Sequence, residues 1–146
     1  MSFVYAVRCN FSRPDLEDRW NAWYGGAKLA EMVTQPLFLS GQRYRAAGLD
    51  QTIKYLALWV VESPDAFTTP VYKKNWGFAE WVPHITDWSR NLYRGPAGDV
   101  SDLLDIPSGG ALYFAAGIDF GLLSVPRLPT TKVLCLMLAI SPAVSL

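Results

Sequence analysis

Residues 20–32, with the sequence WNAWYGGAKLAEM, contribute most to the prediction of the fold. Apolar side chains recur at helical spacing from Leu16 to Ala27, which predicts a helix with one apolar face. The pair Gly25-Gly26 is unfavourable inside a helix by roughly 1 kcal/mol per glycine. We therefore expect a kink or short break there, followed by a second helical piece over 27–34. Lys28 comes directly after the glycine pair and places an amine beside the aromatic side chains.

Four segments outside this helix have the patterns of β-strands. Residues 2–10 and 38–46 alternate between two faces, residues 55–62 are almost continuously apolar and rich in β-forming residues, and residues 85–94 alternate again. A second helical region is expected to begin at Ser63-Pro64-Asp65, with proline at its first position, and to continue past Pro70 to about Glu80.

The resulting order, β-α-β-β-α-β, predicts an α+β fold of the ferredoxin-like class, in which two helices cover one face of a four-stranded antiparallel sheet. The other face of such a sheet would be bare. Because a large exposed apolar face usually marks an interface, we expect two copies to pack face to face as a homodimer with an aromatic-rich interior.

The pattern of residue types in the sequence changes after residue 95. The segment 95–98 reads as a linker, and glycine and proline recur through the residues after it. We predict one domain over 1–95 and a C-terminal extension over 96–146, with strands near 111–118 and 132–140. The extension is expected to be β-rich and to pack on the same domain or on its dimer partner.

Composition excludes several classes of partner. The chain has 146 residues, is 51% hydrophobic and has no formal net charge, from 13 Lys+Arg and 13 Asp+Glu. Without a basic excess, nucleic-acid binding is not expected. The longest apolar run, 133–140, is too short to span a bilayer, and residues 1–10 do not resemble a signal peptide. We therefore expect a soluble, cytoplasmic protein with reduced cysteines, Cys9 and Cys135.

Cofactor motifs are missing from the sequence. It contains one histidine, so a histidine-based metal site is not expected. It has no phosphate-binding loop, no dinucleotide fingerprint and no nucleophile elbow. Any chemistry is therefore expected to be cofactor-free, with no metal.

A set of short motifs resembles the EthD-like proteins of the dimeric α/β-barrel superfamily, over about residues 1–95. These motifs are WY at 23–24, KLAEM at 28–32, RYR at 43–45, YLAL at 55–58, ESP at 62–64 and SRNLYR at 89–94. The resemblance implies a dimeric barrel but no particular reaction, because related barrels include muconolactone isomerases, polyketide cyclases, cofactor-free monooxygenases and dye-type peroxidases.

The chain departs from the pattern of these proteins at Lys28. In EthD-like proteins the corresponding segment resembles Asp-x-Glu-His-Leu-Pro-Glu-Met, with a histidine where this chain has Lys28. The Asp and Glu of that pattern are replaced by Gly25 and Ala27. If the histidine is the acid/base of the family, this chain has an amine in its place. The long extension is a second departure.

Lys28 and His84 are the candidate catalytic residues. Lys28 would form a Schiff base with a carbonyl substrate or donate a proton, and both roles need a pKa lowered by burial or by a neighbouring cation. The alternative is a solvated lysine on a helix. His84 lies between Trp81 and Trp88 in sequence, a setting suited to proton transfer near neutral pH. The alternative is a strand-end histidine bonded to backbone.

The candidate substrate-binding residues are aromatic side chains and charged strand residues. The aromatic ones would wall a pocket, or else fill the core. The charged ones would orient a carbonyl or phenolate, or else pair with each other as a structural ion pair. The candidates are Trp23, Tyr24, Arg43, Trp59, Trp81, Asp87 and Trp88.

Three functions remain open from the sequence. The first is a small cofactor-independent enzyme that acts on an aromatic or apolar carbonyl compound by proton transfer or amine chemistry, as a lyase, isomerase or cyclase. The second is a non-catalytic binding protein for an apolar metabolite. The third is a cofactor-free monooxygenase.

Overall fold

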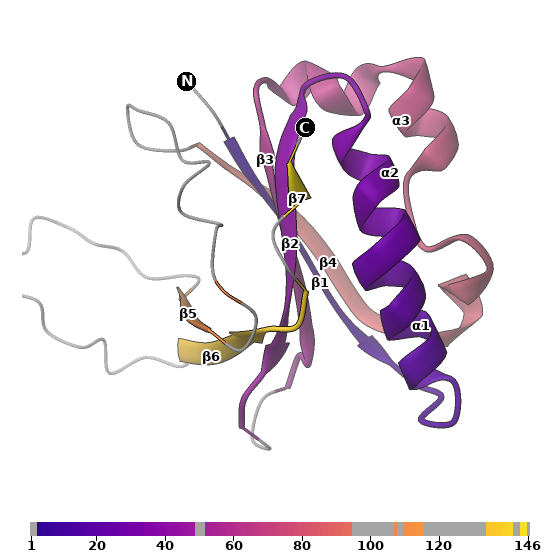
Figure 1. The fold of residues 1–146 in the computed structure, drawn as a ribbon, viewed down its shortest axis with the longest axis vertical. Coiled ribbons are helices and arrows are strands. Elements are labelled where there is room, and N and C mark those ends of the chain that lie inside the picture. Colours follow the sequence, from indigo (N-terminus) through magenta and orange to yellow (C-terminus); the bar gives the residue numbers. More distant parts are fainter. Residues whose placement is uncertain are drawn as a thin grey trace, which may run out of the picture.

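The computed structural model describes residues 3–48, 52–94, 107, 110–115, 134–141 and 144–145. Seven strands, three α-helices and three tighter or wider helical segments are formed within these ranges (Figure 1). In chain order they are β1 (Phe3–Phe11), α1 (Glu17–Trp23), the π-helical turn η1 (Tyr24–Lys28), α2 (Leu29–Val33), β2 (Phe38–Ala46), β3 (Tyr55–Val61), the 3-10 turn η2 (Pro64–Thr68), α3 (Pro70–Asn75), the 3-10 turn η3 (Ala79–His84), β4 (Ile85–Arg94), β5 (Ala111–Ala115), β6 (Leu134–Ala139) and β7 (Val144–Ser145).

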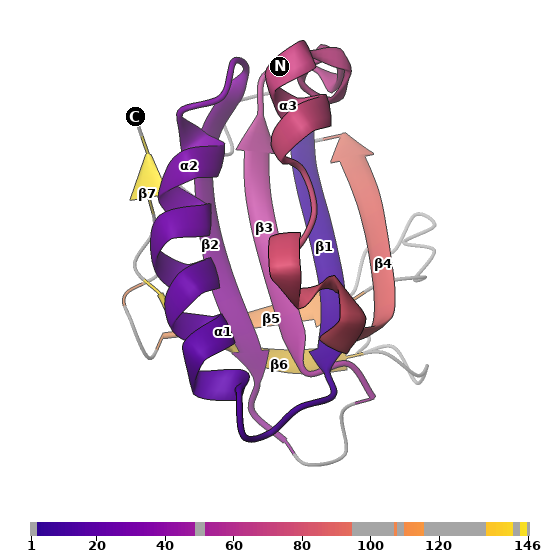
Figure 2. The same cartoon turned by 90° about the vertical axis from the view of Figure 1, so that its right-hand side faces the viewer.

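Strands β4, β1, β3 and β2 lie side by side in that order, and each neighbouring pair is antiparallel. All three α-helices cover the same face of this sheet (Figure 2). The predicted α+β class and four-stranded antiparallel sheet are therefore confirmed. The arrangement is compatible with a ferredoxin-like α+β fold. The sheet continues beyond β2 into β6 and then β5, while β7 also pairs with β2.

The strand predictions agree closely with the structure. The expected bounds of β2 and β4 are the observed ones, those of β1 differ by one residue at each end, and those of β3 differ by one residue at the C-terminal end. Strands β5 and β6 lie within the segments predicted for the extension, whereas the short β7 was not expected. A two-residue alternation with one buried face specifies both a strand and its register, which explains this agreement.

The helix around Gly25-Gly26 does not break as expected. Helix α1 passes into η1 and then into α2, and the backbone stays in the right-handed helical region at Trp23 (φ −63°) and at Leu29 (φ −62°). The glycines are accommodated by one wider π-helical turn, a feature found mostly as a single turn within α-helices. Lys28 is the last residue of that turn.

The second helical region is more fragmented than predicted. Ser63 Oγ accepts a hydrogen bond from the Asp65 backbone N–H at 3.1 Å, so the predicted helix start is confirmed, but a 3-10 turn follows. The α-helix starts only at Pro70 and ends at Asn75, and not near Glu80. Gly77, at φ +93°, separates it from η3. This positive φ is available to glycine at little cost and ends the helical path.

The main core lies between the helices and the sheet. It is dominated by aromatic side chains, including Tyr5, Trp20, Tyr24, Phe38, Tyr55 and Trp59. Gly41 pairs with Trp59 across β2 and β3, and the indole lies over the glycine. A Cβ atom added at Gly41 would lie 2.6 Å from Trp59 Cζ3, so only glycine fits there without a shift.

The opposite face of the four strands is not bare, contrary to the sequence-based expectation. Tyr44, Leu56 and Val60 on this face are at most 1% exposed within the single chain. Strands β5 and β6 lie on this side of the sheet (Figures 1 and 2). At these residues, therefore, no bare apolar face is present that would need a second copy to cover it.

Candidate functional site

Three hollows meet at Trp76, between the α3–η3 segment and β4. The polar cleft has a volume of about 430 Å³ and is lined by Tyr5, Phe67, Tyr72, Trp76, Arg90 and Leu92, among others. The apolar cleft, of about 500 Å³, is lined by Trp76, Phe78, Val82, Ile85 and Trp88 with their neighbours. Between them is the lysine void, of about 30 Å³, whose walls include Tyr24, Lys28, Trp59, Tyr72, Trp76 and Trp88.

Lys28 is the buried cation of this region. The residue is only 5% exposed. The Nζ atom donates a hydrogen bond to the backbone carbonyl of Asn75, at the end of α3, and lies 3.8 Å from a carboxylate oxygen of Glu31. Burial lowers the pKa of the Lys28 amine, and the nearby Glu31 carboxylate opposes part of that effect. The solvated-lysine alternative does not describe this side chain.

Trp76 lines the lysine void together with Lys28. The residue follows α3, is 46% exposed, and contributes to the walls of all three hollows. Its ring lies 6.3 Å from that of Trp88. Gly77 follows Trp76 with a positive φ, and a Cβ atom added at this glycine would meet nothing within 4 Å. The backbone next to the Trp76 indole is therefore not held in place by packing of a side chain at position 77.

Hydroxyl and guanidinium groups converge in the polar cleft. The hydroxyls of Tyr5 and Tyr72 are 3.2 Å apart. The Arg90 guanidinium carbon lies 5.1 Å from the ring centre of Trp76 and 5.6 Å from that of Trp88. Burial alone would lower the pKa of Arg90, but its interactions with Tyr5 and Tyr72 outweigh this and raise it. Burial raises the pKa of the Tyr72 hydroxyl, which therefore stays protonated.

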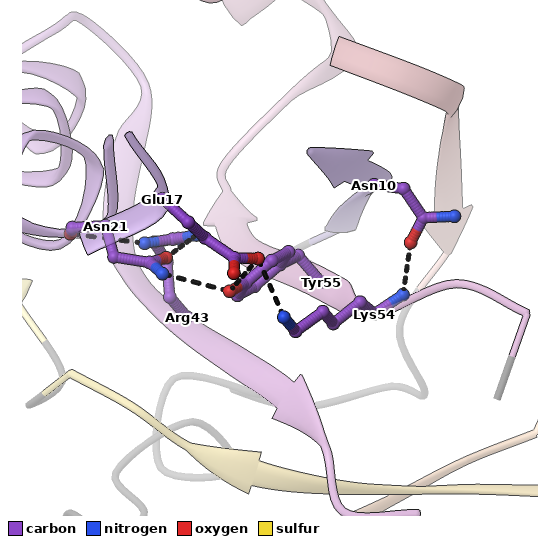
Figure 3. Close-up of polar contacts among 6 residues, drawn as sticks. All are labelled: Asn10, Glu17, Asn21, Arg43, Lys54 and Tyr55. Carbon is purple, nitrogen blue, oxygen red and sulfur yellow. Dashed lines mark hydrogen bonds and ion pairs between the residues drawn. The ribbon is translucent and has the colours of Figure 1, made fainter. Parts of the chain in front are cut away.

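Arg43 is enclosed in the core and does not line these hollows. It is 1% exposed, and its guanidinium carbon lies 4.8, 4.2 and 5.4 Å from the ring centres of Trp20, Tyr24 and Tyr55. Its terminal nitrogens donate to the side-chain and backbone oxygens of Asn21, at 3.0 and 3.4 Å (Figure 3). Burial lowers the pKa of Arg43 to about 10. The charge is thus stabilised mainly by aromatic faces and one amide.

Hydrogen bonds through the side chains of Asn21 and Tyr55 link Arg43 to the carboxylate of Glu17. Asn21 donates to the hydroxyl of Tyr55 at 2.9 Å, and that hydroxyl donates to Glu17 at 2.8 Å (Figure 3). Lys54 also pairs with Glu17, at 2.7 Å. Burial by itself would raise the pKa of Glu17, but the bonds from Lys54 and Tyr55 hold it below its usual value. The network therefore links α1, β2 and β3.

The alternative for Arg43 and Asp87, a structural ion pair between them, is not formed. The two residues lie on β2 and β4, at opposite edges of the four-strand array, with β3 and β1 between them. Asp87 is exposed, has φ +52°, and accepts a hydrogen bond from the Asn10 side chain at 2.9 Å. Asn10 in turn accepts from the Lys54 backbone N–H at 2.7 Å (Figure 3). Asp87 thus participates in contacts at the strand end.

The predicted site residues divide into two groups. Tyr24, Lys28, Trp59 and Trp88 come together around the lysine void. The others lie elsewhere: Trp23 packs on Tyr24 and Trp81, Trp81 is a buried core residue, and His84 packs edge-on against Phe11 with ring centres 5.8 Å apart.

Three important cleft residues were not among the predicted ones. They are Tyr5, Tyr72 and Arg90. Arg90 had a usable signal, because it lies in the alternating segment between Trp88 and Leu92, close to two large apolar residues. Tyr72 had no such signal, since its contact with Tyr5 joins residues 67 positions apart.

Neither a metal cluster nor a membrane-spanning helix is found among the described residues. Within the part of the chain that the structure describes, no group of three or more His, Cys, Asp or Glu side chains is arranged to hold a metal ion. None of the described helices is long and apolar enough to cross a bilayer. No protein-family model, no curated protein and no solved structure matches this chain.

Proposed function

We propose that this chain binds a small aromatic or otherwise apolar carbonyl compound in the hollows around Trp76, and that Lys28 acts on its carbonyl by amine chemistry or proton transfer without a cofactor. One observation carries the proposal: a buried lysine with a lowered pKa borders a small void, which lies between two larger clefts with aromatic walls. Buried lysines of lowered pKa are the ones suited to attack carbonyl groups.

The amine reaction needs a neutral Nζ atom. Burial favours that neutral form, and Glu31, 3.8 Å away and partly exposed, is placed to take up the released proton. The amine would add to the carbonyl carbon, and return of the proton from Glu31 with loss of one water molecule from the adduct would give the protonated imine. The lysine void holds little more than one small group, as a water needs about 10–15 Å³. The remainder of the substrate must therefore occupy a larger cleft.

Trapping with a reductant tests this proposal. The protein is incubated with an aryl aldehyde and cyanoborohydride over a range of pH, and the modified peptides are identified by mass spectrometry. We expect modification of Lys28 to begin at a lower pH than that of the exposed Lys74, because burial lowers the Lys28 pKa. Lys28→Met should abolish this early modification, whereas the control Lys74→Met should not. Labelling of exposed lysines alone would contradict the amine mechanism.

The second candidate is a non-catalytic binding protein for an apolar metabolite. It is favoured by the hydrogen bond from Lys28 to the Asn75 carbonyl, which occupies the amine in this structure. This function predicts tight binding without turnover, and little loss of binding in Lys28→Ala or His84→Ala. The trapping experiment and a turnover assay on the same compound separate the two functions.

Two structural predictions are also part of this proposal, the ferredoxin-like arrangement and the homodimer. We infer a ferredoxin-like arrangement for residues 3–94, supported by the element order and by the strand order β4-β1-β3-β2. The resemblance to EthD-like proteins still predicts a homodimeric barrel. Because Tyr44, Leu56 and Val60 on the second sheet face are buried within one chain, a dimer would have to use another surface or rearrange the extension, and sedimentation velocity measures whether a dimer forms.

A further inference from the structure

We propose that the polar cleft selects aromatic compounds that carry a carboxylate or phenolate group, and that Arg90 is the residue that binds this anion. The inference deepens the proposed function, because it names the chemical class of compound for the same region. It rests on that function only for the location of the ligand, since its own support comes from the charges and donors of the polar cleft.

The charge of the polar cleft favours an anion. Two cationic side chains, Lys73 and Arg90, contribute to its lining, and the described lining contains no Asp or Glu. No ion pair joins Arg90 to a carboxylate in the part of the chain that the structure describes. Because a guanidinium has five N–H donors, its interactions with Tyr5 and Tyr72 leave donors of Arg90 for an oxyanion.

Arg90 is an exposed residue whose guanidinium is flanked by aromatic neighbours. Its guanidinium lies close to the rings of Trp76 and Trp88, and it interacts with the hydroxyls of Tyr5 and Tyr72. Stacking on aromatic faces holds a guanidinium in one orientation and leaves its edge free. The energetic cost of ordering this side chain on binding is therefore partly met before the ligand arrives.

The tyrosine pair supplies one further donor. When Tyr5 and Tyr72 share a hydrogen bond across 3.2 Å, one hydroxyl hydrogen is used in the pair and the other remains available. The pKa of Tyr72 is raised by burial, so its hydroxyl remains a donor at neutral pH. An anionic oxygen next to Arg90 can accept from whichever of the two hydroxyls does not donate within the pair.

The aromatic part of the ligand has complementary walls in the same cleft. Phe67, Trp76 and Leu92 line it beside the polar groups. The polar cleft and the lysine void have Tyr5, Tyr72 and Trp76 in common. An aromatic anion held by Arg90 would therefore project its other end toward Trp76 and Lys28. The compounds that fit best are aromatic carboxylates or phenolates that also carry a carbonyl group.

A charged and a neutral ligand of equal shape test the proposal. Binding of 2-naphthoate and 2-naphthamide is measured by calorimetry and by tryptophan fluorescence at low salt. We expect naphthoate to bind about tenfold or more tightly than naphthamide, as hydrogen bonds to charged groups are the stronger ones. Raising the salt concentration should weaken naphthoate binding and leave naphthamide binding unchanged.

Two arginine variants locate the anion. Arg90→Gln should weaken naphthoate binding about tenfold and change naphthamide binding less than twofold. The control Arg19→Gln changes an exposed arginine on α1 that lines none of the three hollows, and should alter neither affinity. Circular dichroism and thermal unfolding establish that each variant is folded.

The outcomes separate this inference from the proposed function. Equal affinity for the two ligands, equal losses for both in Arg90→Gln, or no binding of naphthoate would each overturn the anion site. In those cases the proposed function still stands if Lys28 is trapped by a neutral aryl aldehyde. Preferred binding of naphthoate without any modification of Lys28 would keep the anion site and reject the amine mechanism.

Discussion

Gly41→Ala gives the sharpest test of the packing that encloses Lys28. In the wild-type chain, Gly41 on β2 faces Trp59 on β3, and the indole occupies the volume that a side chain at position 41 would need. An added Cβ would lie 2.6 Å from Cζ3 and 3.2 Å from Cδ2 of Trp59. Trp59 is 1% exposed and the void that it borders measures about 30 Å³, so its ring has little free space into which to move.

The expected magnitude comes from two opposing terms. Overpacking of a core by one methyl group costs typically about 1–3 kcal/mol. Replacing glycine by alanine within a strand recovers roughly 0.5–1 kcal/mol of chain entropy. Because the contact involves a fully buried indole, we expect the upper part of the first range and a net loss of about 2 kcal/mol in the free energy of unfolding. In a domain of this size that lowers Tm by several degrees.

Urea denaturation and calorimetry measure the effect, and Gly26→Ala is the matched control. A Cβ at Gly26 meets nothing within 4 Å in its helical turn. That substitution should be neutral or should stabilise the protein by up to about 1 kcal/mol. If Gly41→Ala is as stable as the wild type, the described placement of Trp59 over the strand is wrong. Since Trp59 also borders the lysine void, the destabilised variant should show an altered pH dependence of Lys28 modification.

Three further predictions test other parts of the structure. Arg43→Ala should lower the free energy of unfolding by roughly 3 kcal/mol or more in urea denaturation, because it leaves a cavity among three aromatic rings; a loss below about 1 kcal/mol would argue against that enclosure. Burial raises the pKa of Cys9 to about 12, although Arg43 opposes the rise, so in a Cys135→Ala background the thiol should not react with Ellman's reagent at pH 8–9 until denaturant is added. The stability contributed by this protonated thiol is complete below the pKa of the unfolded thiol, near 9, and is lost as pH rises toward 12. Trp76→Ala should increase the rate of Lys28 trapping severalfold, and an unchanged rate would show that this indole does not limit access to the amine.

The strands and their faces were predictable from the sequence, whereas the path of the helical segments was not. Residues 38–46 and 85–94 carry their own alternation, and this local signal gives the bounds of β2 and β4. The Gly25-Gly26 pair has a clear local cost, but the cost does not say whether a helix stops or widens. That outcome depends on the sheet beneath, against which Trp20 and Leu29 are fully buried.

The candidate site was predictable only in part, and the tryptophans show why. Trp59 is flanked by apolar residues and Trp76 follows a helical segment. Trp59 is buried in the sheet, whereas Trp76 is half-exposed and forms the wall of a cleft. Which of them borders a cleft depends on how α3 and η3 lie over β4, and local spacing does not encode that packing. Lys28 was identified through its position after the glycine pair, whereas the convergence of Tyr5, Tyr72 and Arg90 arises only when three distant segments meet.

The π-helical turn has a consequence for how the chain can vary in length. Trp20 and Met32 are twelve positions apart, and in a regular α-helix they would face directions roughly 120° apart. Both nevertheless pack into the same core cluster. If the wide turn takes up one residue, eleven effective steps remain, and the two side chains face within roughly 20° of each other.

An inserted residue at this point is thus absorbed locally, without rotating the rest of the helix. Lys28 ends the absorbing turn, so a loss of one glycine would move the amine and leave the core in phase. In this chain, the position of Lys28 can change without any change in the scaffold.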